Sequence, residues 1–266
     1  MAIGKFNLLR KLKEAYWEKW YSYVSKTDKG NELTFMNYGY QGDKDLPLLQ
    51  HQEKNRFQIQ LYDKTLSSIP SDPRKASVLE VGCGRGGGLT YLAEQYPDAS
   101  FLGLDLCQAA VDSCNSSNKR ENLRFAWGDA RALGLSQGLF DAIINIESSH
   151  RYPDMPRFLK EVRRVLKPNG YFSIVDFRAT DKIPELKHQL RSSGMQVLEE
   201  EDITPNVLRA MDLDDPRKLD LIKRLVPRPL HFPAREFASV VGSQSYRSLL
   251  NGQRQYLRFL LKKSKS

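Results

Sequence analysis

From Ser77 onward, short β-type runs alternate with helical segments, and this alternation limits the possible folds more than any other feature of the sequence. Strands separated by helices are typical of βαβ units, which build a parallel sheet covered by helices on both faces. We therefore predict an α/β, Rossmann-like fold. Its expected strands lie near 77–82, 100–105, 123–127, 140–146 and 170–176, and its expected helices near 87–96, 107–118, 154–166 and 181–193.

The two ends of the chain depart from this alternation. Residues 5–24 place apolar and aromatic side chains at helical spacing among Lys and Arg, which predicts an amphipathic helix. Such a helix either packs on the domain as a lid or rests on a membrane surface. We expect an N-terminal helical and loop lid at 1–60 and the main domain at 61–266. Within that domain we expect a core at 75–200, a lid insertion at about 204–245 and a final strand at about 253–262.

The formal net charge of +9 is concentrated near the ends of the chain. Residues 1–30 carry +4 and residues 217–266 carry +10, whereas the remainder carries −5. A mildly acidic centre disfavours a nucleic-acid groove across the catalytic face. The three cysteines show no CxxC spacing, so we expect neither a disulfide nor a metal site. The absence of a long apolar run and of a signal-peptide pattern favours a cytoplasmic location.

The segment VLEVGCGRGGG places a strand directly before a glycine-rich turn and a helix start. Gly82, Gly84 and Gly87 fit GxGxxG, a turn that dinucleotide enzymes also use to approach a pyrophosphate. Glu80 separates dinucleotide enzymes from enzymes that bind a phosphate-free methyl donor. A carboxylate there would repel a pyrophosphate, but it suits a nucleoside that carries an ammonium and a sulfonium. The glycines alone leave a dehydrogenase open.

Two more acidic residues stand at the ends of the next expected strands. Asp105 ends FLGLD, where its carboxylate can accept both ribose hydroxyl protons in either class of enzyme. Asp129 lies in Gly128-Asp129-Ala130, where a carboxylate can accept the exocyclic amine of adenine. A helix cap is the competing interpretation of Asp129. Together with Glu80, these positions favour a methyl donor.

The sequence resembles the class I S-adenosylmethionine-dependent methyltransferases at ExGxGxG (residues 80–86), Asp105 and the GDA of 128–130. Further segments, among them GLDLCQAAVDSC and AREFASVVGSQSYRSLLNG, look like the mycobacterial phthiotriol and phenolphthiotriol dimycocerosate methyltransferases. The resemblance implies a seven-stranded sheet with a helical lid, S-adenosyl-L-methionine as cofactor, no metal, and O-methylation of a lipid or polyketide hydroxyl. Related enzymes often have MNYGYW where this chain has Gln41 after Tyr40. The expected donor-binding residues are Tyr38, Glu80, Gly82, Cys83, Gly84, Asp105, Leu106, Gln108, Gly128, Asp129, Ala130, Asn145 and Glu147.

An alcohol acceptor must lose its proton, and a histidine suits this because its unperturbed pKa lies near neutral pH. His150 follows the fourth expected strand, at the edge where open α/β sheets bind ligands. Asp176 ends the next strand, where it can orient the His150 ring. Glycoside O-methyltransferases related to the rebeccamycin enzyme have a His and an Asp at these two strand ends, which implies the same roles. The alternative is that both residues are caps.

Other functions stay open at this point. Glu147 is expected beside the donor, although a glutamate in this region binds bicarbonate in cyclopropane-forming lipid methyltransferases. Carbon methylation of an isoprenoid or lipid alkene would produce a carbocation, which Tyr38, Tyr40 and Trp127 could stabilise. A non-enzymatic binding protein is a third possibility. Base methylation of nucleic acids is disfavoured, because residues 145–148 lack the Asn/Asp-Pro-Pro-aromatic signature, and the basic C-terminal segments do not form an evident stacking platform.

Overall fold

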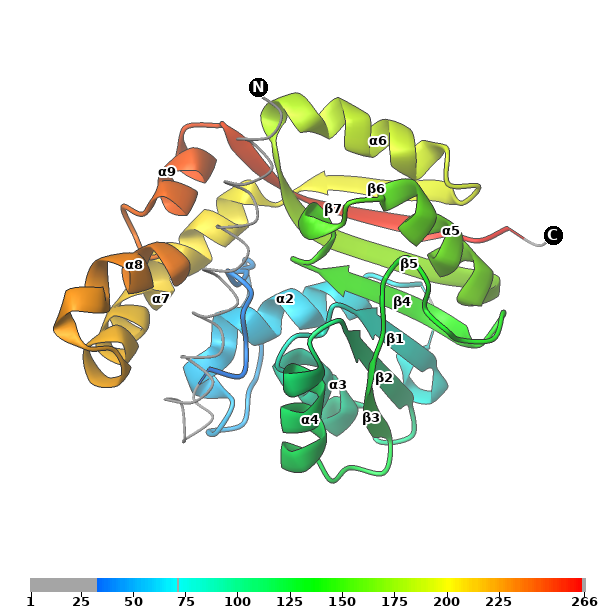
Figure 1. Cartoon of the computed structure of the whole chain (residues 1–266), viewed down its shortest axis with the longest axis horizontal. Coiled ribbons are helices and arrows are strands. Elements are labelled where there is room, and N and C mark those ends of the chain that lie inside the picture. Colours follow the sequence, from blue (N-terminus) through cyan, green and yellow to red (C-terminus); the bar gives the residue numbers. More distant parts are fainter. Residues whose placement is uncertain (1–32, 71, 265–266) are drawn as a thin grey trace, which may run out of the picture.

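The structure is a computed structural model that describes residues 33–70 and 72–264. Within these residues, seven strands form one sheet in the order β3-β2-β1-β4-β5-β7-β6 (Figure 1). Strands β1 to β5 run parallel to one another, and β7 pairs antiparallel with both β5 and β6. The strands are β1 (Ser77–Val81), β2 (Ser100–Asp105), β3 (Leu123–Trp127), β4 (Phe140–Ile146), β5 (Leu166–Ala179), β6 (Gln196–Asp202) and β7 (Arg254–Lys262). The predicted Rossmann-like α/β fold is confirmed.

Helices cover both faces of the sheet because side chains of each strand alternate between two apolar cores. Val78 points into the core under α2, α3 and α4, whereas Leu79 points into the core under α5 and α6. These helices are α2 (Arg56–Ser67), α3 (Gly87–Gln95), α4 (Gln108–Ser117), α5 (Met155–Val165) and α6 (Ile183–Arg191). Short 3₁₀ turns connect several of these elements, namely η1 (Glu53–Asn55), η2 (Pro73–Lys75), η3 (Ser149–Arg151) and η4 (Thr180–Lys182).

The predicted strands and helices lie close to their expected positions, with two differences, one in a strand and one in a helix. β5 extends past Asp176 to Ala179 because residues 171–179 pair along their whole length with β7. Helix α2 was absent from the expected elements. Its buried face includes Gln58, Gln60 and Thr65, and these polar side chains hide the apolar periodicity by which an amphipathic helix is recognised.

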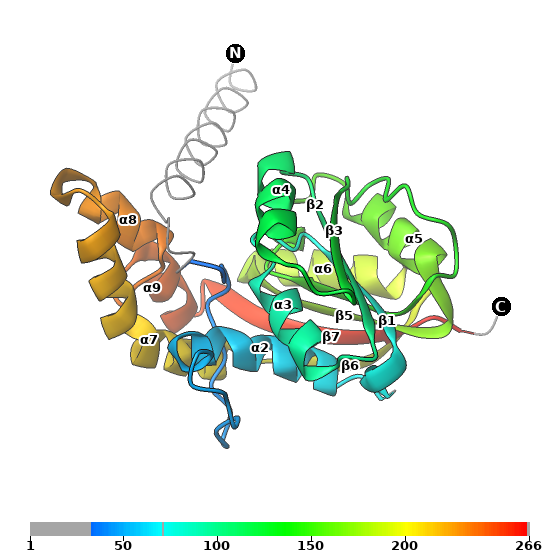
Figure 2. The ribbon, with the colours of Figure 1, turned by 90° about the horizontal axis from the view of Figure 1, so that it is seen from below.

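Helices α7 (Thr204–Leu225), α8 (His231–Phe237) and α9 (Gln244–Leu250), with η5 (Arg228–Leu230), lie together beside the sheet (Figures 1 and 2). They occupy the side toward which β4 points, so they face the carboxyl ends of the parallel strands. These helices span most of the segment at about 204–245 that was expected as a lid insertion, and α7 begins at its first residue. The expected helix at 5–24 lies outside the described residues. None of the helices within residues 33–264 has the length and apolar character needed to cross a membrane.

Candidate active site

The glycine-rich turn joins β1 to α3 and adopts a backbone that favours glycine. Gly82, Gly84 and Gly86 have φ of +82°, +54° and +72°. A Cβ on Gly82 would lie 1.9 Å from the Ser148 Oγ, so this position also needs glycine for space. The backbone N–H groups of Gly82 and Cys83 donate to the Leu104 carbonyl at 2.7 and 3.0 Å. The turn is thereby fixed at the end of β2.

Glu80 is fully buried directly before this turn. The Tyr62 hydroxyl donates to its Oε1 at 2.7 Å, whereas Oε2 has no hydrogen-bond partner. Burial raises the pKa of Glu80 to about 8, against the lowering effect of the Tyr62 hydrogen bond. A buried carboxyl oxygen without a partner is costly, so a cationic or hydroxyl donor from a ligand would stabilise it. This observation fits a nucleoside that carries an ammonium group.

Asp105 stands at the end of β2 beside the same turn. Its Oδ2 accepts from the Gly84 N–H at 2.8 Å, and its Oδ1 accepts from the Cys107 N–H at 2.9 Å. Each carboxylate oxygen has further lone pairs, so both remain able to accept ribose hydroxyls. Leu106 next to it is 63% exposed, and Gln108 at the start of α4 donates to Asp112. Asp105, Leu106 and Gln108 thus lie between the end of β2 and the start of α4.

Asp129 follows β3, and its oxygens are engaged by Arg131. The Arg131 Nε lies 3.0 Å from Oδ1 and its Nη2 lies 2.7 Å from Oδ2, and the Arg131 N–H donates to Oδ1 at 2.8 Å. The hydrogen bond from Arg131 lowers the pKa of Asp129. Gly128 packs against Leu104, and Ala130 is partly buried. An adenine amine at Asp129 would therefore share the carboxylate with Arg131 or displace it.

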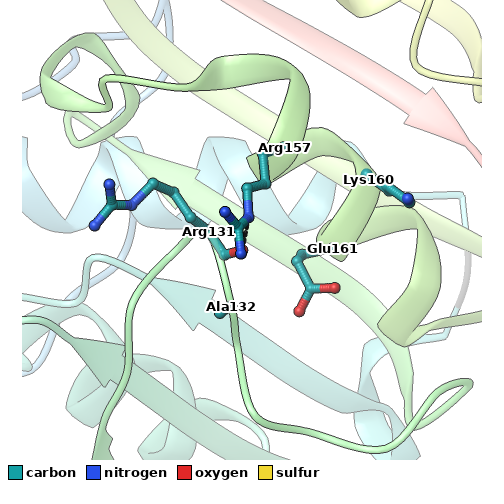
Figure 3. A pocket seen from close by; sticks show the side chains of 5 residues that line it. All are labelled: Arg131, Ala132, Arg157, Lys160 and Glu161. Carbon is teal, nitrogen blue, oxygen red and sulfur yellow. Dashed lines mark hydrogen bonds between the residues drawn. The ribbon is translucent and has the colours of Figure 1, made fainter.

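Arg131 also borders a surface hollow of about 390 Å³ lined by Arg131, Ala132, Arg157, Lys160 and Glu161 (Figure 3). Its acidic residue, Glu161, already accepts from Arg164 and from the Leu133 N–H. The hollow lies on the α5 side of the sheet, and no residue of the expected site lines it; Arg131 is the partner of the expected Asp129. The hollow is therefore separate from the expected site at the carboxyl edge of the sheet.

Asn145 lies near the end of β4, next to β1, and Glu147 directly follows the last residue of that strand. The Asn145 amide donates to the Val81 carbonyl at 2.7 Å, whereas its Oδ1 is buried without a partner. Glu147 has a φ of +46°, a rare conformation for a non-glycine residue. Its Oε1 accepts from the Tyr38 N–H and from the Tyr256 hydroxyl, both at 2.6 Å. Glu147 thus ties the segment before α2 to β4 and β7.

The protonation of Glu147 follows from its surroundings. Burial raises its pKa to about 8, although the hydrogen bonds from Tyr256 and Tyr38 lower it. The side chain is therefore mostly neutral at pH 7. A strained backbone and a perturbed carboxyl group at one position are typical of functional sites.

His150, in η3 after β4, meets Asp176, which lies in the last third of β5. The His150 Nδ1 lies 2.8 Å from the Asp176 Oδ1, and the His150 backbone N–H donates to Oδ2 at 2.8 Å. Asp176 is 2% exposed and also accepts from the Ser149 hydroxyl at 2.7 Å. Burial alone would raise the pKa of Asp176, but His150 and Arg178 outweigh it and hold that pKa below its usual range.

This geometry leaves one ring nitrogen of His150 free of the carboxylate. Because a carboxylate accepts the Nδ1 proton, the Nε2 atom of a neutral ring is an acceptor. The side chain is 25% exposed, so part of the ring is accessible to a bound molecule. The pair has the arrangement of a base and its orienting carboxylate.

Aromatic rings surround His150 on the side of β5 and β7. The Phe177 ring lies 4.3 Å from the His150 ring and is stacked on Tyr38 at 5.4 Å, with an interplanar angle of 6°. The Tyr256 ring lies 6.2 Å from Phe177. Phe177 and Tyr256 were not predicted as site residues, nor was Tyr62 beside Glu80. Phe177 directly follows Asp176, so a broader search of strand ends could have found it, whereas Tyr62 and Tyr256 carry no sequence signal.

The structure separates the aromatic residues Tyr38, Tyr40 and Trp127 from one another. Trp127 ends β3, which lies four strand spacings, roughly 19 Å, from β5. The Tyr40 ring faces Lys64, at 5.9 Å. Of the three, only Tyr38 belongs to the cluster around His150.

Comparisons with known proteins agree with this arrangement. A family model described as "Methyltransferase domain" matches residues 79–174. The chain is 38% identical over 242 residues to a phthiotriol/phenolphthiotriol dimycocerosates methyltransferase of Mycobacterium tuberculosis, covering 90% of this chain and 89% of that protein. It is 36% identical to a fatty-acid O-methyltransferase of Mycolicibacterium smegmatis, covering 89% and 85%.

A solved structure shows the same fold at low sequence identity. The O-methyltransferase from a trans-AT PKS multienzyme of Brevibacillus brevis, in complex with S-adenosyl-L-homocysteine, superposes with a TM-score of 0.64 at 18% identity, covering 85% of this chain and 84% of that one. The unpartnered oxygens of Glu80 and Asn145 and the glycine turn beside Asp105 suit S-adenosylmethionine, the methylated form of this ligand. The chain belongs to the class I S-adenosylmethionine-dependent methyltransferases.

Proposed function

We propose that this methyltransferase methylates a hydroxyl oxygen of a lipid or another lipophilic small molecule, with His150 as the general base and Asp176 as its orienting carboxylate. The bound donor supplies a methyl group on a positively charged sulfur. Glu80, Asp105 and Asn145, together with the glycine turn, would hold it. Residues of about 204–245 would form part of the lid over the site; of the expected N-terminal lid at 1–60, residues 1–32 lie outside the described residues.

The His150–Asp176 pair is the observation that carries this proposal. A hydroxyl is a weak nucleophile until its proton is removed, and a histidine oriented by a buried carboxylate performs that step near neutral pH. The Nδ1 contact of 2.8 Å to Asp176 sets the ring so that Nε2 can accept the proton. The buried carboxylate then stabilises the positive charge that forms on the ring.

A lipophilic acceptor is supported by the apolar surroundings of His150. Phe177 lies beside the imidazole and Tyr38 stacks on Phe177; both rings are part-exposed, and the fully buried Tyr256 packs behind them. Burying apolar area against them stabilises a complex by about 25 cal/mol per Å². The two relatives described above are, by their names, methyltransferases of a lipid and of a fatty acid, which agrees with this chemistry.

The test is to incubate the protein with isotopically labelled donor and a lipid extract, and then to repeat the assay with His150→Gln. We expect a labelled lipid product, and a loss of about 10²- to 10⁴-fold in kcat for the variant with donor affinity unchanged. His188→Gln, an exposed histidine on α6, is the matched control and keeps full turnover. Undiminished turnover of the His150 variant would contradict the base assignment.

Carbon methylation of a lipid or isoprenoid alkene is the second candidate. The part-exposed rings of Tyr38 and Phe177 would stabilise a carbocation through their π faces. NMR of the labelled product separates the two reactions, because an O–CH₃ carbon resonates far from a C–CH₃ carbon.

A further inference from the structure

Arg254 lies beside the aromatic rings that adjoin His150. It begins β7 and pairs with Ala179, the last residue of β5, and two positions along the same ladder Phe177 pairs with Tyr256. Because side chains alternate between the two faces of a strand, Arg254 lies on the same face as Phe177 and Tyr256. The Arg254 Cζ lies 5.5 Å from the centroid of the Phe177 ring. A cation thus borders the surface proposed for the acceptor.

The Arg254 guanidinium is not engaged by any polar group in the described part of the chain. No acid there lies within ion-pair distance of it, and no acceptor there receives a hydrogen bond from it. The neighbouring cation, Arg178, is fully engaged. It donates to the Phe177 carbonyl and to the Ser149 hydroxyl, both at 2.8 Å. It also lies 3.0 Å from the Asp176 Oδ2, so Arg178 is committed to the protein, whereas Arg254 is available to a ligand.

A neutral lipid would be a poor ligand beside Arg254. The side chain is part-exposed, so water can solvate its N–H groups in the free protein. An apolar chain placed against Phe177 would remove that water and leave a charged donor without a partner, which costs free energy. The π face of Phe177 attracts the cation but does not replace these hydrogen bonds. An anionic group would replace them, because a planar guanidinium binds a carboxylate or a phosphate through two parallel hydrogen bonds.

The position of Arg254 relative to His150 limits where this anionic group stands on the acceptor. The centroid of the Phe177 ring lies 4.3 Å from that of the His150 ring and 5.5 Å from the Arg254 Cζ. A single aromatic ring thus links the two groups. A hydroxyl at His150 and an anionic group at Arg254 would therefore belong to the same end of the acceptor.

We propose that Arg254 binds an anionic oxygen group, a carboxylate or a phosphate, that stands close to the methylated hydroxyl of the acceptor. The acceptor would then be an acidic hydroxy lipid. This inference rests on the proposed lipid acceptor and adds to it a requirement for charge and for the position of that charge. A charge-assisted hydrogen bond in a site from which water is removed contributes about tenfold or more to affinity.

The experiment measures binding by calorimetry in the presence of S-adenosyl-L-homocysteine. The ligands share one hydroxylated chain and differ in the head group: β-hydroxypalmitate, the phosphate monoester of the matching diol, and the neutral β-hydroxypalmitamide. We expect the wild-type protein to prefer at least one anion over the amide by about tenfold or more. The preferred anion identifies the group as a carboxylate or a phosphate. Equal affinity for all three, or no binding of either anion, would overturn the proposal.

Arg254→Gln removes the charge, and we expect this variant to bind the three ligands within about twofold of one another. Arg254→Lys keeps a cation and therefore keeps a preference for the anions. Arg247→Gln is the matched control, because Arg247 lies exposed on α9, and it keeps the full preference. If Arg254 only packs on Phe177, Arg254→Gln weakens all three ligands equally and the preference stays. If Arg254 holds the donor, the variant loses affinity for S-adenosyl-L-homocysteine and the preference again stays; either result would overturn the proposal.

The binding result is independent of the base assignment. Binding is measured without turnover, so a failure of His150 as base leaves the Arg254 result intact. Turnover with labelled donor then tests the position of the charge. We expect the preferred anion to have a kcat/KM at least about tenfold above that of its isomer with the hydroxyl on the last carbon of the chain. Equal values would overturn the placement beside His150. A methyl ester of the anionic group, identified by NMR, would show that this group is itself the acceptor and would overturn both proposals.

Discussion

Replacing Glu80 with glutamine should abolish the pH dependence of donor binding. Glu80 is buried, has one unpartnered oxygen and has a pKa of about 8, so it is mostly protonated at pH 7. A ligand ammonium would bind its ionised form. Ionising it at pH 7 costs about 1.4 kcal/mol, because each pKa unit corresponds to about 1.36 kcal/mol. The affinity of the wild-type protein at pH 7 is therefore about tenfold below its limit at high pH.

The assay is titration calorimetry with S-adenosyl-L-homocysteine between about pH 5.5 and 7, where the ligand amine stays protonated. We expect the association constant to rise about tenfold per pH unit, with one proton released per ligand bound. The released proton is measured by repeating the titration in buffers of different ionisation enthalpy. Glu80→Gln should bind more weakly and without this slope.

Glu147→Gln is the matched control, because Glu147 has a similar pKa but is held by Tyr38 and Tyr256. The slope should survive in this variant. A slope that persists in Glu80→Gln and disappears in Glu147→Gln would refute the reasoning, and it would place the ligand cation at Glu147.

Three further outcomes are expected. The free energy of unfolding of the apo protein should fall as pH rises from about 4.5 to about 8, because the pKa of Glu147 is raised in the folded state. Glu147 contributes up to about 1.4 kcal/mol per pH unit to this fall. Denaturant titrations should show a flatter profile for Glu147→Gln, and an identical profile would contradict the linkage. Gly82→Ala should lose about 1–3 kcal/mol more stability than Gly84→Ala, because both have positive φ but only Gly82 would meet Ser148; equal losses would show that the contact relaxes. Asp176→Asn should lower kcat by about 10²- to 10⁴-fold, since an amide cannot stabilise the charged His150 ring; steady-state kinetics with an unchanged kcat would remove Asp176 from the mechanism.

The order of strands and helices could be predicted from the sequence because it depends on local properties. Period-2 and period-3.6 patterns and turn glycines are set by neighbouring residues, so Glu80, Asp105 and Asn145 could be located near their strand ends, whereas β5 continues three residues past Asp176 because of its pairing with β7. Because parallel strands end at the same edge of a sheet, the sequence also predicted that these residues lie near one another. The His150–Asp176 pair was predicted from this rule, and its ring contact follows from the register of β4 on β5.

The tertiary structure decided which face of α2 is buried, including its polar side chains, and which partners the site residues have. Tyr62 reaches Glu80, Tyr256 reaches Glu147, and Gln58 reaches Asp214 across 18, 109 and 156 residues of sequence. No local pattern encodes such pairs, since they depend on how α2, α7 and β7 pack on the sheet. The residues of the donor loop can thus be identified from the sequence, whereas the raised pKa of Glu80 arises from burial, which only the packed fold creates.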